Sequence, residues 1–272
     1  PKSLQNVSHP TPIFAPKSLH QIVPTPIFAP KSSPKNLARP PLVGADHFTQ
    51  PLHKLIMYLI YDTETNKLGA DACAVEVGAM LVDGAFNVLD TYETLVQLPP
   101  GAVLDPRASA VHGIEQRDLD TFGALPAQVF DRLAALAAQA QWCVAYNNQF
   151  DLRVLGNLQP ARHPFIAPPR PAPAQFCLML AMTDICKIKG FKYKYKWPNL
   201  QQAHAHCFGV GFSAGHEALT DVAASVRILK WYREHVGELS CNNEPVWAEV
   251  RLAVESSPAS ALAAAPPMVA GS

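Results

Sequence analysis

The distribution of proline confines any folded core to the middle of this 272-residue chain. Of its 26 prolines, 11 precede residue 55 and four follow residue 240. Proline lacks a backbone donor and interrupts helices and sheets, so segments rich in proline are expected to stay irregular. We therefore predict a disordered extension over residues 1–54, a folded domain over 55–238, and a flexible Ala/Pro-rich tail over 239–272.

The extension contains a nine-residue segment, PTPIFAPKS, at residues 10–18 and again at 24–32. Its period is too short for a helical solenoid. Two interpretations stand: a linear motif or basic tether, or a dispensable extension, which we favour. The first methionine is Met57, which leads to the hypothesis that translation begins there. The intact mass of the natively expressed protein tests this hypothesis.

Charge and cysteine content narrow the class of protein. The net charge is zero, so affinity for nucleic acid has to come from a local basic patch. The six cysteines form no Cys-x-x-Cys pair and no secretory signal is present, which predicts reduced thiols in the cytoplasm. The apolar run over residues 55–61 is too short to span a membrane. We expect it to form a buried strand.

The order of expected elements predicts an α/β fold. Strand-like runs occupy residues 54–62, 72–82 and 87–98, with turn residues between them. Three antiparallel strands followed by alternating helix and strand indicate a mixed sheet flanked by helices. Residues 176–185 fit either a strand or a helix. The other expected elements are a helix from Pro126, a strand over 142–146, a helix ending at Leu158, helices over 199–206 and 217–234, and a short helix considered for 245–254.

Asp62 and Glu64 form the first cluster of residues that suggests chemistry. Residues two apart on a strand point to the same face, with α-carbons about 6.6 Å apart. Two carboxylates converging in this way suit a pair of divalent ions about 3.5 to 4 Å apart. An Asp-x-Glu pair at a strand end is common, so the pair needs support from elsewhere in the chain.

That support comes from His216, Asp221 and Asp151. Five residues on a helix turn through about 500°, so His216 and Asp221 cannot share one face, and His216 is expected in the preceding loop. Asp221 and Asp151 both fall on apolar helix faces, where a carboxylate needs a partner or a metal. A structural ion pair is the alternative for Asp221. Four gathered carboxylates favour hard cations such as magnesium or manganese.

These segments resemble the three motifs of the DEDDh 3'-5' exonucleases, relatives of the epsilon proofreading subunit of bacterial DNA polymerase III. Asp62-Thr63-Glu64 is similar to the first motif, residues 147–151 to the second, and His216-x-Ala218-x-x-Asp221 to the third. The similarity runs over about residues 57–231. Tyr146 stands where the family usually has histidine, a position that is not a metal ligand.

The resemblance implies a ribonuclease H-like fold and hydrolysis that releases nucleoside monophosphates from DNA 3' ends, in proofreading or repair. It implies two divalent cations, Mg²⁺ or Mn²⁺, with single-stranded DNA and a DNA polymerase subunit as partners. Residues 110–114 also resemble a family segment near the substrate. The expected catalytic and metal-binding residues are Asp62, Glu64, Asp151, Asp221 and His216, and the expected substrate-binding residues include Thr63, Thr65, His112, Asn147 and Phe150.

Residues 187–197 form the local basic patch of the chain. Five lysines alternate with aromatic and apolar residues. In one interpretation Lys192, Lys194 and Lys196 follow phosphates while the rings stack on unpaired bases. In the other, the segment is an amphipathic hairpin with buried aromatic residues and solvated lysines. The sequence alone does not favour either interpretation.

Two other functions compete with a DNA exonuclease. The same acids and metals would cleave RNA, and no feature of the sequence relates to a 2'-hydroxyl. A non-catalytic module that binds nucleic acid or a polymerase is the second alternative, and the complete set of acids with the histidine argues against it.

Overall fold

The computed structural model describes residues 56–159, 162–166, 171–212, 216–242 and 244–255. These residues all belong to one compact unit, Phe48–Ser272. The expected disorder of residues 1–54 and their repeats lie outside the described residues. No helix within the described ranges is long and apolar enough to cross a membrane.

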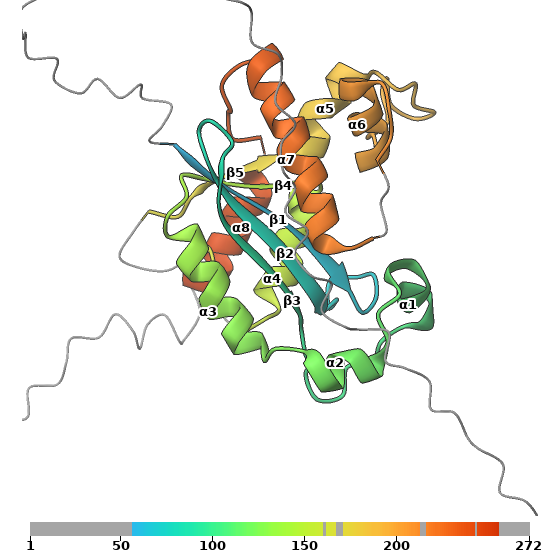
Figure 1. Ribbon diagram of the computed structural model, residues 1–272, viewed down its shortest axis with the longest axis vertical. Coiled ribbons are helices and arrows are strands. Elements are labelled where there is room, and N and C mark those ends of the chain that lie inside the picture. Colours follow the sequence, from blue (N-terminus) through green and yellow to red (C-terminus); the bar gives the residue numbers. More distant parts are fainter. Residues whose placement is uncertain (1–55, 160–161, 167–170, 213–215, 243, 256–272) are drawn as a thin grey trace, which may run out of the picture. The chain divides into compact units, whose positions relative to one another are not determined.

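A five-stranded mixed sheet forms the centre of the unit (Figure 1). β1 pairs antiparallel with β2, and β2 pairs antiparallel with β3, as predicted for the first three strands. β4 and β5 add to the other edge of β1 as parallel strands, giving the order β3-β2-β1-β4-β5. The strands are β1 (Met57–Thr65), β2 (Ala74–Asp83), β3 (Val88–Leu95), β4 (Trp142–Ala145) and β5 (Ala174–Cys177).

β1 lies in the middle of the sheet and packs against a core on each of its faces. Leu59 and Tyr61 belong to one cluster of buried side chains, and Tyr58 and Ile60 belong to the other. A strand buried on both faces has a continuous apolar sequence, which explains the run before Asp62. The polar residues of β1 therefore begin only where the two cores end.

Helices cover both faces of the sheet (Figure 1). The core that contains Leu59 is closed by α3, α4 and α8, and the core that contains Ile60 is closed by α5, α6 and α7. These helices are α3 (Pro126–Ala137), α4 (Asn148–Gly156), α5 (Leu178–Cys186), α6 (Leu200–Phe208), α7 (Ala218–His235) and α8 (Glu244–Glu255).

Two short helices between β3 and α3 were not predicted. They are α1 (Pro106–His112) and α2 (Gln116–Phe122), each of seven residues. Two turns of helix show too little periodicity to be recognised in a sequence. End signals are nevertheless present, because Asp105 caps α1 and Gly113 ends it in a left-handed conformation with φ 76°.

The structure decides two assignments that the sequence left open. Residues 176–185, which fit either a strand or a helix, contain both: β5 ends at Cys177 and α5 begins at Leu178. Residues 244–255 form α8, which agrees with the short helix considered for 245–254 and not with the flexible tail assigned from residue 239; Val250 packs partly buried against the larger core. The tail is rich in alanine and proline as a whole, but the apolar residues of this segment recur at the spacing of a helix.

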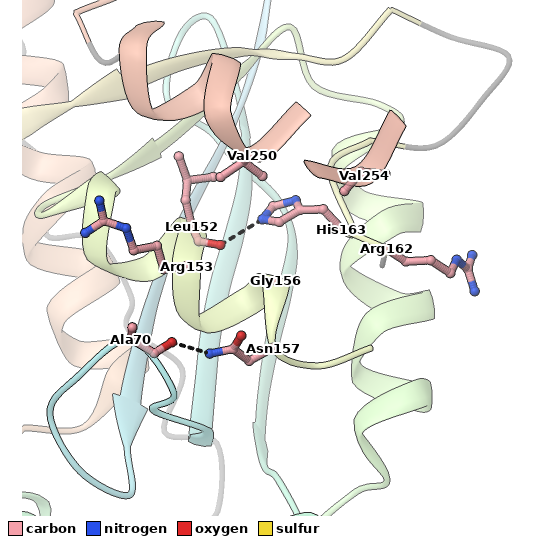
Figure 2. Close-up of a pocket in the computed structure, with 9 residues that line it drawn as sticks. All are labelled: Ala70, Leu152, Arg153, Gly156, Asn157, Arg162, His163, Val250 and Val254. Carbon is pink, nitrogen blue, oxygen red and sulfur yellow. Dashed lines mark hydrogen bonds between the residues drawn. The ribbon is translucent and has the colours of Figure 1, made fainter. Parts of the chain in front are cut away.

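α8 lies beside α4, and a pocket of about 230 Å³ remains between them (Figure 2). Leu152, Val250 and Val254 supply apolar walls. The buried His163 ring lies 3.0 Å from the Leu152 carbonyl, and Asn157 donates to the carbonyl of Ala70 at 3.1 Å. These bonds tie the loops around α4 to the helix.

Gly78 allows the first turn of α7 to lie directly on β2. A Cβ at this position would lie 2.6 Å from both the Ala218 carbonyl carbon and the Leu219 nitrogen, which are backbone atoms. Gly78→Ala is therefore expected to lower the free energy of unfolding by about 1–3 kcal/mol, as overpacking does. Urea denaturation measures the change.

Gly156→Ala is the matched control, because its Cβ would meet only the His163 ring at an ordinary 3.6 Å. In a helix this change is expected to be neutral or stabilising by up to about 1 kcal/mol. Equal stabilities of the two variants would contradict the close approach of α7 to β2.

Candidate active site

Asp62 and Glu64 extend from the face of β1 that packs against α7. The alternation of the strand places them on the side of Tyr58 and Ile60, and both remain partly exposed. Thr63, between them, is buried and points to the opposite side of the sheet. The two carboxylates therefore converge on one side of the strand end, as the sequence predicted.

Asp221 reaches the same place from α7. It lies in the first turn of the helix and is partly buried, and burial raises the pKa of its carboxyl while nearby His216 lowers it. Its Oδ1 atom is buried and has no hydrogen-bond partner among the described residues. A buried carboxylate oxygen without a partner is unfavourable unless a cation or proton occupies the site.

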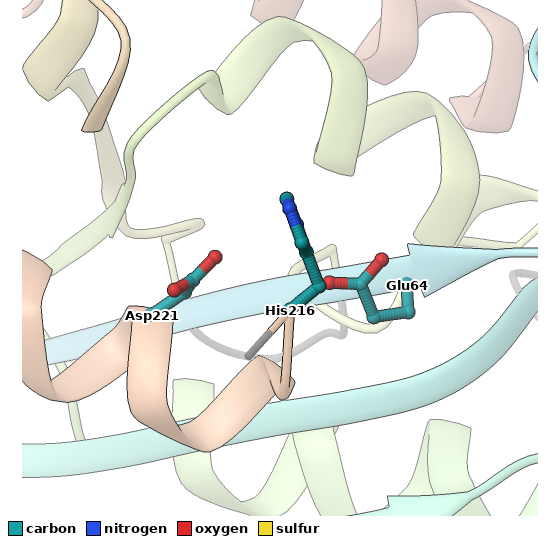
Figure 3. A group of neighbouring side chains, drawn as sticks. All are labelled: Glu64, His216 and Asp221. Atoms are coloured by element: carbon teal, nitrogen blue, oxygen red, sulfur yellow. The ribbon is translucent and has the colours of Figure 1, made fainter. Parts of the chain in front are cut away.

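His216 precedes α7 and lies off the helix, as its spacing from Asp221 required. Its backbone has a left-handed φ of 51°, which is uncommon for a residue other than glycine. The side chain is exposed and lies between Glu64 and Asp221 (Figure 3). One ligand atom from each of these three residues falls within 4.8 Å of the others.

Asp151 completes the acidic group from α4. Thr63 donates a hydrogen bond of 2.8 Å from its hydroxyl to Asp151, so the buried threonine orients the carboxylate. Burial raises the pKa of the Asp62 carboxyl well above its usual range, and the nearby charges of Asp151 on α4, Asp221 on α7 and Glu64 raise it further. The structure therefore brings the four predicted acids together.

The electrostatics of this group favour a bound cation. Burial, with Asp221, Glu76 and Asp151 nearby, raises the pKa of Glu64 to about 8. Burial also raises the pKa of Asp151 to about 7, although the Thr63 hydrogen bond opposes the shift. Carboxylate oxygens are the donors that hard divalent cations prefer. The donor set and the unpartnered Asp221 oxygen thus fit such an ion.

Glu76 is a fifth acid that the sequence analysis missed. It lies on β2 directly opposite Glu64 and accepts a 2.9 Å hydrogen bond from the backbone nitrogen of Ala218, the first residue of α7. A carboxylate at a helix N-terminus binds free N–H groups and is favoured by the helix dipole. Glu76 therefore holds the start of α7 against the sheet. An acid within an apolar strand was the available signal.

His112 lies next to the end of β1, close to Thr65 and His216. The side chain is buried, and its Nδ1 accepts a 3.1 Å hydrogen bond from the Ile114 nitrogen. Burial lowers the pKa of His112, and nearby His216 lowers it further, while an interaction with the Thr65 backbone raises it. The neutral ring therefore carries its proton on Nε2.

The remaining predicted substrate residues border the acids in different ways. Thr65 is buried and donates from its hydroxyl to the Lys67 carbonyl. Asn147 is exposed at the N-cap of α4 without a side-chain capping bond, and Phe150 is partly buried against a core. Lys192, Lys194 and Lys196 lie elsewhere, on the exposed segment between α5 and α6.

The pocket beside α8 is separate from this site, since none of the four acids, His112 or His216 lines it.

Comparisons with known proteins support a nuclease fold. The model of the RNase_T exonuclease family matches residues 59–229. The chain is similar to zinc-bound E. coli exonuclease I with single-stranded DNA, with a TM-score of 0.55 and 20% identity over 66% of this chain and 41% of that chain. No curated protein sequence matches the chain.

Two further solved structures give the same result. E. coli exonuclease I with a dA16 oligonucleotide has a TM-score of 0.55 and 18% identity, covering 66% of this chain and 41% of that chain. Another exonuclease I structure has a TM-score of 0.57 and 17% identity, covering 76% of this chain and 45% of that chain. The chain thus spans less than half the length of these proteins, and identities this low show the fold alone.

Crowded acids make the metal-free protein sensitive to pH. The pKa of Glu64 rises from 4.5 to about 8 in the folded protein, so the folded state is progressively destabilised as pH increases between these values. Glu64→Gln removes this effect. In EDTA at about pH 8 we expect the variant to exceed wild type by more than about 1 kcal/mol in the free energy of unfolding, and to match it near pH 4.5.

Both proteins retain His163, whose pKa is lowered to about 4 by burial, so its contribution cancels in the comparison. Asp131→Asn on the exposed face of α3 serves as the control and should show little pH-dependent gain. A gain from Glu64→Gln that does not grow with pH would contradict the crowding of the acids.

Proposed function

The chain belongs to the RNase_T exonuclease family, and on this basis we propose that it is a DEDDh-type 3'-5' exonuclease that releases nucleoside monophosphates from single-stranded DNA. The observation that carries this proposal is the convergence of Glu64, His216 and Asp221 within 4.8 Å, with Asp62 and Asp151 beside them. A histidine beside the acids distinguishes this branch of the exonucleases from its tyrosine-bearing relatives.

Asp62, Glu64, Asp151 and Asp221 would hold two divalent cations, Mg²⁺ or Mn²⁺. Such ions supply charge stabilisation for a phosphate and lower the pKa of water. The carboxylates bring negative charge to one place and therefore select cations over other ligands. Thr63 keeps the Asp151 carboxylate in one orientation through its hydrogen bond.

His216 would act as the general base. A neutral imidazole can accept the proton of the attacking water, and histidine is the side chain that most readily exchanges a proton near neutral pH. Because His216 is exposed and lies outside α7, its ring can face both the acids and an incoming strand.

His112 would contact the terminal nucleotide. Its Nδ1 atom already accepts from the Ile114 nitrogen, so the neutral ring has its donor at Nε2, on the side of the Thr65 backbone. A neutral donor can bind an oxygen or a base nitrogen without adding positive charge next to the cations. Thr63, Thr65, Asn147 and Phe150 lie around the same end of the sheet and would complete the nucleotide site through their backbone or side-chain atoms.

DNA is proposed as the substrate because exonuclease I, similar in fold, has been solved with single-stranded DNA. Proofreading or repair, with a DNA polymerase subunit as partner, follows from the resemblance to the epsilon subunit alone. A cytoplasmic location is proposed because the six cysteines of the sequence form no Cys-x-x-Cys pair.

Substitutions of the site separate chemistry from folding. Asp62→Ala is expected to abolish nucleotide release, because it removes the carboxylate that lies among the other three acids. His216→Ala should reduce the rate by roughly 10²–10⁴-fold, the usual contribution of a general base. Release from a labelled oligonucleotide with Mn²⁺ measures both.

His206→Ala changes an exposed histidine on α6 and serves as the control, with near wild-type turnover expected. Turnover close to that of wild type in either site variant would refute the assigned roles.

Polarity and substrate class are tested with matched oligonucleotides. A 5'-labelled single-stranded DNA should shorten by single nucleotides from its 3' end, and a blocked 3' end should stop the reaction. EDTA should abolish release, and Mg²⁺ or Mn²⁺ should restore it. Faster degradation of the matched RNA would assign the chain to the exoribonucleases, and no degradation of either polymer would leave a binding module.

A further inference from the structure

The segment between α5 and α6 is an exposed basic hairpin. Lys189 and Tyr195 form an antiparallel bridge, and the backbone nitrogen of Lys196 donates to the Ile188 carbonyl at 2.9 Å. Gly190 permits the tight turn, because a Cβ there would collide with the Tyr193 carbonyl oxygen. We call residues 187–197 the lysine hairpin.

The aromatic side chains of the lysine hairpin face solvent. Phe191 is fully exposed, and Tyr193 and Trp197 are 69% and 64% exposed. Soluble proteins seldom expose several large rings in one short segment without a ligand. The interpretation of an amphipathic hairpin with buried aromatics is therefore wrong for these three residues.

The stretch of sequence that contains the lysine hairpin carries no acidic residue. Five lysines and no acidic residue occur between Asp184 and Glu217, in a chain whose net charge is zero. Lys192, Lys194 and Lys196 are all exposed and take part in no ion pair among the described residues. Lysines that alternate with exposed rings suit a single-stranded nucleic acid, because lysines bind phosphates and aromatic rings stack on unpaired bases.

The base of the lysine hairpin is fixed near the acidic site. Tyr146 donates from its hydroxyl to the Pro198 carbonyl at 2.8 Å, directly after the hairpin. Because Val144 pairs with Ile60, Tyr146 is level with Asp62, and its ring packs in the same cluster as Ile60. The base of the hairpin is therefore held at the same end and the same face of the sheet as Asp62.

We propose that the lysine hairpin is a second binding surface for the single strand whose 3' end lies at the acids. This inference rests on the proposed exonuclease function and adds where the rest of the substrate binds. Its lysines bind phosphates and its exposed rings stack on bases several nucleotides from the terminus. A long strand would thus be held at two places while its terminal nucleotide is removed.

Binding in EDTA tests the surface without hydrolysis. We would measure fluorescence anisotropy of labelled single-stranded oligonucleotides of about 4 and about 20 nucleotides, lengths that bracket common single-strand site sizes. The triple variant Lys192→Ala, Lys194→Ala, Lys196→Ala should bind the longer strand about 10–100-fold more weakly. Its salt slope should fall by about 2, since each single-strand phosphate contact contributes about 0.7.

The rings are tested separately from the charges. Phe191→Ala with Trp197→Ala should weaken binding of the longer strand about tenfold, as loss of base stacking does, with an unchanged salt slope. The deficits should be smaller for the short oligonucleotide and for a blunt duplex, whose bases are already paired. Lys194→Ala alone, compared with Lys230→Ala on the exposed side of α7, keeps the test valid if the multiple variants unfold.

Wild-type affinity and salt slope in the triple variant would overturn the proposal. Equal losses for the blunt duplex and the single strand would overturn the assignment to unpaired bases. Hydrolysis by the wild-type protein in Mn²⁺ is measured in parallel. If wild type binds but does not hydrolyse, the proposed function fails while the binding result still decides the role of the hairpin.

Discussion

The contact between the first turn of α7 and the backbone of β2 at Gly78 determines where the acidic site can form. The helix carries Asp221, and His216 precedes it, so the positions of both side chains depend on where the first turn of α7 packs on the sheet. Glu76 stabilises this packing by accepting a hydrogen bond from the Ala218 nitrogen. Because Glu76 also pairs with Glu64 across the sheet, one strand supplies both the support for the helix and a neighbour for the site.

Folding this chain requires placing negative charges close together in a partly dry environment. The pKa values of Asp62, Glu64 and Asp151 all rise, mainly because burial disfavours their charged forms. The two cores on either side of β1 supply the free energy that overcomes this repulsion. The site is therefore most unfavourable in the state without cations, and selectivity for cations results directly from that instability.

Regular geometry made much of the site predictable from sequence. Alternation along β1 set Asp62 and Glu64 on one side, and helical rotation required His216 to lie outside α7. Glu76 escaped notice because its importance comes from a partner, Ala218, that is 142 residues away. The exposure of Phe191 likewise depends on how the hairpin leaves the fold, which alternating lysines and rings do not encode.

The alternation of β1 side chains between the two buried faces of the sheet also limits how this protein can change in evolution. Side chains one residue apart on a strand face opposite sides of the sheet. Loss of a single residue from the middle of β1 would therefore turn Asp62 and Glu64 toward the α4 side and bring threonines to α7. Insertions and deletions should accumulate in the connections between elements, while the length of this strand stays constant among chains that keep the site.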